Sequence, residues 1–115
     1  MSLSLFRFIF FAGFVSIAPS AAFAQACSAI QGSWNGTFTR DGAGPQPISI
    51  TISASCSAEW TLPNMCSLSN VQGTRATYQC SRGSVGTVTI AKNLLTWRNT
   101  VTGPQHGFYT IRVSR

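Results

Sequence analysis

The fold class is decided by one stretch of the chain, VGTVTIAKNLLTWRN, which spans residues 85–99. Within it, Val88 and Ile90 alternate with threonines, and this period of two is typical of a half-buried β-strand. A two-residue turn at Lys92-Asn93 would place Val88 opposite Trp97, with the other apolar residues of the hairpin on the same face. The stretch therefore predicts an antiparallel hairpin with one apolar side.

The same alternation recurs along the chain, and no segment after residue 24 shows a sustained helical period. We expect eight strands, near residues 33–40, 46–53, 58–62, 67–71, 75–80, 85–91, 94–99 and 107–113. Turns near Ala43 and Gly103 would give two further hairpins, with the pairs Trp34–Ile52, Phe38–Ile48, Leu95–Ile111 and Trp97–Tyr109. The chain is therefore expected to be all-β, a small antiparallel meander of about eight short strands that forms a closed or nearly closed barrel. A strongly curled open sheet is the alternative.

Four cysteines are available for disulfides: Cys27, Cys56, Cys66 and Cys80. A hairpin centred on Gly73 would bring Cys66 opposite Cys80, within bridging distance, and leave Cys27 to pair with Cys56. A hairpin centred on Thr61 would instead favour Cys56–Cys66, and lipidation of Cys27 is a competing fate. The spacing matches no zinc site, because the chain has no Cys-x-x-Cys and a single histidine.

Residues 1–24 have the order of segments found in a cleavable secretory signal. Arg7 supplies a cation, Phe8–Ala18 is an apolar run too short to span a bilayer, and Ala22-Phe23-Ala24 is a small-residue exit. We expect cleavage to leave one domain, residues 25–115, with no transmembrane segment after processing. Its location is then periplasmic or secreted, where disulfides persist.

The composition argues against catalysis. The chain has eight Lys and Arg residues against two acids, a formal net charge of +6, and one histidine. General acid–base chemistry would depend on Asp41, Glu59 and His106 alone, so we expect no enzyme activity, catalytic residue, metal or cofactor. The cations are scattered, which does not favour nucleic-acid binding but allows attraction to an anionic surface.

A few residues are candidates for contact with a ligand or partner. Trp60 follows an acid on a short expected strand, Arg82 begins a glycine-rich connection, and His106 lies in a late loop. With Arg98, they form the candidate set Trp60, Arg82, Arg98 and His106. Trp60 could equally belong to the core, and the loop residues could serve only as turns.

The segment Gly32-Ser33-Trp34 resembles the start of the calycin group, which comprises lipocalins, avidins and small bacterial metalloprotease-inhibitor barrels. Members carry Gly-x-Trp on the first strand, and many pack a basic residue of the last strand over that tryptophan. Arg112 stands at a matching position. The resemblance implies a β-barrel that acts by binding.

The functional expectation is an exported small β-barrel binding protein, either an inhibitor-like module with a protein partner or a carrier of a small ligand. Two alternatives remain open. One is a cell-envelope module that recognises anionic glycan or lipid, and the other is a cationic secreted effector.

Overall fold

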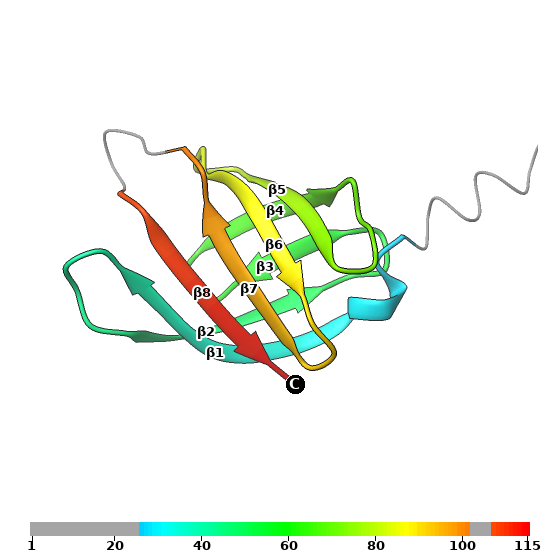
Figure 1. Ribbon diagram of the computed structural model, residues 1–115, viewed down its shortest axis with the longest axis horizontal. Coiled ribbons are helices and arrows are strands. Elements are labelled where there is room, and N and C mark those ends of the chain that lie inside the picture. Colours follow the sequence, from blue (N-terminus) through cyan, green and yellow to red (C-terminus); the bar gives the residue numbers. More distant parts are fainter. Residues whose placement is uncertain (1–25, 102–106) are drawn as a thin grey trace, which may run out of the picture.

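The computed structural model describes residues 26–101 and 107–115, so the expected signal peptide lies outside the described residues. The chain forms a closed barrel of eight antiparallel strands in sequence order, preceded by a short 3-10 helix (Figure 1). The elements are η1 (Ser28–Ile30), β1 (Gly32–Arg40), β2 (Gln46–Ile52), β3 (Ser57–Trp60), β4 (Asn64–Ser69), β5 (Arg75–Cys80), β6 (Val85–Ile90), β7 (Leu94–Asn99) and β8 (Tyr109–Ser114). The expected all-β meander is confirmed, and it closes.

Alternation of side chains explains why these residues form strands around one core. Leu95 and Trp97 of β7 point inward and are fully buried, whereas Arg98 between Trp97 and Asn99 is exposed. The same in–out pattern runs along the other strands, with threonine on many outward positions. Closure by pairing of β1 with β8 leaves no free sheet edge.

Two glycines permit the tight curvature of this small barrel. A Cβ at Gly36 of β1 would collide with the backbone carbonyl of Arg112 in β8, and a Cβ at Gly86 of β6 would collide with that of Arg98 in β7. Any other residue would push these neighbouring strands apart.

The register of the β6–β7 hairpin is the predicted one, since Val88 pairs with Trp97 and Ile90 with Leu95. The expected register of β1 and β2 is wrong by two residues, because Trp34 pairs with Ile50 and not with Ile52. Phe38 likewise pairs with Gln46, and not with Ile48. The turn starts directly after β1, where the Ala43 N–H donates to the Arg40 carbonyl at 3.0 Å and Gly42 adopts a φ of +80°.

The expected register of β7 and β8 is also wrong by two residues. Trp97 pairs with Ile111 and Leu95 with Val113. The cause is the buried Asn99, whose side-chain oxygen accepts the Tyr109 N–H at 2.9 Å, so that β8 begins later than expected. A shift of two residues keeps every side chain on its predicted face, so the residues predicted to point into the barrel do so despite both register errors.

Strand β4 begins at Asn64, three residues before the expected start, because the β3–β4 turn contains only Thr61, Leu62 and Pro63. This tight turn pairs Ala58 with Cys66 and thereby removes the alternative Cys56–Cys66 bridge.

Both disulfides follow the predicted pairing. Cys66 lies opposite Cys80, and the two Cα atoms are 3.9 Å apart. Cys27 bonds to Cys56 and ties the segment before β1 to the β2–β3 connection. Two disulfides are typical of a protein that folds outside the reducing cytosol. In the parts of the chain that the structure covers, no helix has the length and apolar character needed to cross a membrane.

The end of the barrel at Trp34, the closed end, is covered by η1, an element that the sequence did not predict. The indole N–H of Trp34 donates to the Ile30 carbonyl at 2.9 Å. The basic residue over Trp34 is Arg115, whose guanidinium carbon lies 4.4 Å from the ring centre. Arg112, expected in that role, is exposed on the outer wall, because its neighbours in β8, Ile111 and Val113, occupy the inward positions.

Candidate functional site

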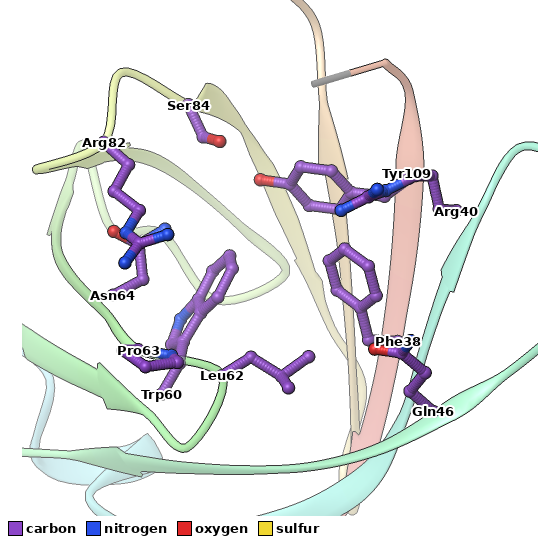
Figure 2. A pocket seen from close by; sticks show the side chains of 10 residues that line it. All are labelled: Phe38, Arg40, Gln46, Trp60, Leu62, Pro63, Asn64, Arg82, Ser84 and Tyr109. Atoms are coloured by element: carbon purple, nitrogen blue, oxygen red, sulfur yellow. The ribbon is translucent and has the colours of Figure 1, made fainter. Parts of the chain in front are cut away.

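A pocket of about 390 Å³ opens at the other end of the barrel, the open end. It is formed where β1 ends, β2 begins, β3 turns into β4, β5 turns into β6, and β8 begins. The residues that line it are Phe38, Arg40, Gln46, Trp60, Leu62, Pro63, Asn64, Arg82, Ser84 and Tyr109 (Figure 2). Strands that alternate in direction bring these distant segments to the same end of the barrel.

The inner walls of the pocket are aromatic. The Phe38 ring stacks on the Tyr109 ring with centroids 5.0 Å apart and an interplanar angle of 27°. Trp60 meets Tyr109 edge-on, with centroids 6.1 Å apart and an angle of 85°. Figure 2 shows Trp60 and Phe38 on opposite sides of the space, with Leu62 between them at its base. The interior therefore offers two flat apolar surfaces.

A second aromatic layer supports these walls from inside the barrel. Trp97 lies 5.7 Å from Trp60 and 5.0 Å from Tyr78 between ring centroids. The Tyr78 and Tyr109 hydroxyls form a buried hydrogen bond of 2.8 Å. Burial, reinforced by this bond, raises the pKa of Tyr78 above its ordinary value.

Hydrogen-bond donors outnumber acceptors around this cluster. The indole N–H groups of Trp60 and Trp97 are buried and meet no acceptor within the described residues. One hydrogen bond between two hydroxyls uses a single O–H, so the other O–H of the Tyr78–Tyr109 pair is left over. A buried donor without a partner costs about 1–3 kcal/mol, which an acceptor brought by a ligand or a water would offset.

The rim of the pocket is polar and positively charged. Arg40 reaches it from the end of β1 and Arg82 from the β5–β6 turn, and Asn64 at the start of β4 also lines it (Figure 2). The Arg40 guanidinium is placed 5.9 Å from the centre of the Phe38 ring. Ser84 is 4 % exposed and turns its hydroxyl toward the pocket. No Asp or Glu occurs among these lining residues, all of which belong to the described ranges.

The four sequence candidates are not placed together. Trp60 and Arg82 line the same pocket. Arg98 points outward from the barrel wall, where it lies between Thr87 and Thr110 of the neighbouring strands. His106 lies outside the described residues.

Sequence reasoning missed most of the pocket, including Phe38, Arg40, Asn64 and Tyr109. A signal was present, because alternate connections of an antiparallel meander must share one end of the barrel. Strands β1, β3, β5 and β7 all end at the open end.

No group of three or more His, Cys, Asp or Glu side chains in residues 26–101 and 107–115 is arranged to hold a metal ion. The arginines, amides, hydroxyls and rings of the pocket are groups that bind and orient a molecule.

In comparisons with known proteins, no protein-family model, no curated protein and no solved structure matches the chain.

Proposed function

We propose that this chain is a binding module whose open-end pocket holds a small ligand. The observation that carries the proposal is a pocket of about 390 Å³ with aromatic walls, set in a closed barrel and lined by Trp60, whose buried indole N–H has no acceptor among the described residues. Sites for small molecules are concave, largely apolar and furnished with a few polar groups, and their volumes start at about 300 Å³.

Binding fits this pocket better than catalysis. Proton transfer near neutral pH normally uses His, Asp or Glu, and the lining residues of the described chain include none of these. Tyr78, the titratable group with a raised pKa, is held neutral behind the pocket wall.

Export to the periplasm or beyond belongs to the same proposal. The two disulfides support an oxidising location, and the segment order of residues 1–24 supports a cleaved signal. The resemblance to the calycin group stays part of the proposal, although the arginine over Trp34 is Arg115, which follows β8, and not Arg112.

Recognition of an anionic glycan or lipid remains a second candidate, and one observation favours it. Arginines and threonines form two adjacent rows across the outer wall from β5 to β1, and no acid interrupts either row. The first row is Arg75, Thr89, Thr96, Arg112 and Thr37, and the second is Thr77, Thr87, Arg98, Thr110 and Thr39. Such a surface suits an extended polyanion.

A thermal-shift screen with small organic molecules tests the leading proposal. A true ligand raises the melting temperature by binding only the folded state. We expect Leu62→Trp, which fills the base of the pocket, to abolish the shift. Leu94→Trp is the matched control, because Leu94 is 39 % exposed at the β6–β7 turn, and it should preserve the shift.

The outcomes separate the two candidates. A shift that survives in Leu62→Trp, or no shift with any compound, would count against the pocket. Binding to an anionic polysaccharide that weakens steeply with salt and is lost in Arg98→Gln/Arg112→Gln would favour the outer wall.

A further inference from the structure

We propose that the ligand is a small organic anion with a flat, apolar body, which enters with its body between Trp60 and Phe38 and leaves its anionic group at the arginine rim. This inference rests on the proposed function and specifies the chemistry of the molecule bound.

The shape of the interior selects the body of the ligand. Trp60 and Phe38 face each other across the pocket, and Leu62 closes the space between them (Figure 2). The Phe38 ring is held in place by its stacking on Tyr109, and Trp60 is held by edge contacts with Trp97 and Tyr109. Rigid aromatic walls favour a planar ring system over a flexible chain, because stacking loses little conformational entropy.

The charge of the rim selects the head group. Arg40 borders the pocket from the end of β1 and Arg82 from the β5–β6 turn, so two positive charges lie at the mouth. Asp41 is the acid that follows Arg40 in the sequence. It lies exposed in the β1–β2 connection and does not line the pocket. Glu59 is exposed on the opposite face of β3 from Trp60. A carboxylate or sulfonate at the mouth would therefore meet cations without competition from lining acids.

The hydrogen-bond balance points the same way. The Trp60 N–H lacks an acceptor, and the Tyr78–Tyr109 pair has one O–H to spare. Asn64 and the two arginines add further donors at the rim. A ligand rich in acceptors matches this environment, whereas a cation or a ligand rich in donors would leave these groups unsatisfied.

Two fluorescent probes that share one aromatic body test the inference. One is 8-anilinonaphthalene-1-sulfonate, and the other is N-phenyl-1-naphthylamine, which lacks the sulfonate. Both brighten on entering an apolar site, so their dissociation constants can be measured by titration of the processed protein. We expect the sulfonate probe to bind one site at least tenfold more tightly, and we expect this advantage to shrink as salt rises.

Arginine variants locate the head group. Arg40→Gln/Arg82→Gln should raise the dissociation constant of the sulfonate probe at least tenfold and change that of the neutral probe less than twofold. The neutral probe therefore also reports that the double variant is folded. Arg98→Gln/Arg112→Gln removes the same two charges from the outer wall and should leave both dissociation constants unchanged within twofold.

Each contrary result has a distinct meaning. Equal binding of the two probes, or an equal loss in Arg98→Gln/Arg112→Gln and in the rim variant, would overturn the anionic specificity while leaving a pocket that binds apolar molecules. Failure of both probes to bind would overturn the inference together with the proposed function.

Discussion

The Arg115 guanidinium packs on the Trp34 ring at 4.4 Å and donates hydrogen bonds to the backbone carbonyls of Gln31 at 2.9 Å and Ala29 at 2.8 Å. One side chain thus joins the segment after β8 to β1 and to η1. The contact covers the closed end of the barrel, and the pocket opens at the opposite end.

Removal of this contact should lower stability measurably. We expect Arg115→Ala to reduce the free energy of unfolding by about 1–2 kcal/mol, the value of a cation–π contact and two partly exposed hydrogen bonds. Arg112→Ala, an exposed arginine in β8, should change it by less than about 0.5 kcal/mol. Urea denaturation measures both, and equal losses would show that Arg115 has no special structural role.

A methyl group at Gly86 should separate two strands. The Cβ of Gly86→Ala would collide with the Arg98 carbonyl, so we expect a loss of about 1–3 kcal/mol or failure to fold. Gly73→Ala is the control, because a Cβ there meets no atom within 4 Å. Comparison of the two melting temperatures checks the prediction, which is wrong if Gly86→Ala melts like Gly73→Ala.

The disulfide between β4 and β5 should contribute about 3 kcal/mol, as expected for a crosslink between positions 14 residues apart. We expect Cys66→Ala/Cys80→Ala to lose this amount and to retain a bonded Cys27–Cys56 pair. Denaturation curves give the loss, and a non-reducing peptide map gives the pairing. Free thiols in the purified unmodified protein would contradict the assignment.

Alkaline pH should destabilise the fold through Tyr78. Its pKa is raised in the folded state by burial and by the hydrogen bond to Tyr109, so above about pH 10 the unfolded chain releases a proton that the folded chain retains. Stability is then unaffected by this group below pH 10 and falls as pH rises beyond it. In Tyr78→Phe the free energy of unfolding should fall less steeply with pH, by the slope that corresponds to the release of about one proton. Unfolding curves between pH 8 and pH 11 measure this slope, and identical slopes would refute the explanation.

The sequence predicted which residues form strands and which of their side chains point inward, because both depend on local alternation. β5 and β7 have the predicted bounds, and the β6–β7 register follows from a two-residue turn whose geometry leaves little choice. The Cys66–Cys80 bridge was predicted from a hairpin centred on Gly73, and the observed register places the two cysteines opposite each other. Longer turns are less constrained. The observed registers of β1–β2 and β7–β8 each differ by two residues from the predicted ones, with Gly42 at a positive φ in the first connection and the Asn99 side chain bonded to Tyr109 at the second.

The pocket was predicted only in fragments. Trp60 and Arg82 were singled out as isolated residues, while Arg40 and Tyr109, which share their site, carried no local signal. The arginine over Trp34 was expected to be Arg112 and is Arg115. Arg112 points outward from β8, whereas Arg115, three residues later, reaches the ring and η1.

The order of amino acids alone determined which side chains face inward, because alternation within a strand survives any shift of two residues. It also favoured the pairing of the cysteines that the structure shows, while the observed β3–β4 register removed the alternative Cys56–Cys66 bridge. Only the tertiary structure decided that β1 meets β8, that η1 and Arg115 cover one end, and that arginines and aromatic rings from separate strands and turns converge at the other. Those features depend on strand twist and barrel closure, which are properties of the whole sheet and have no counterpart in any single segment.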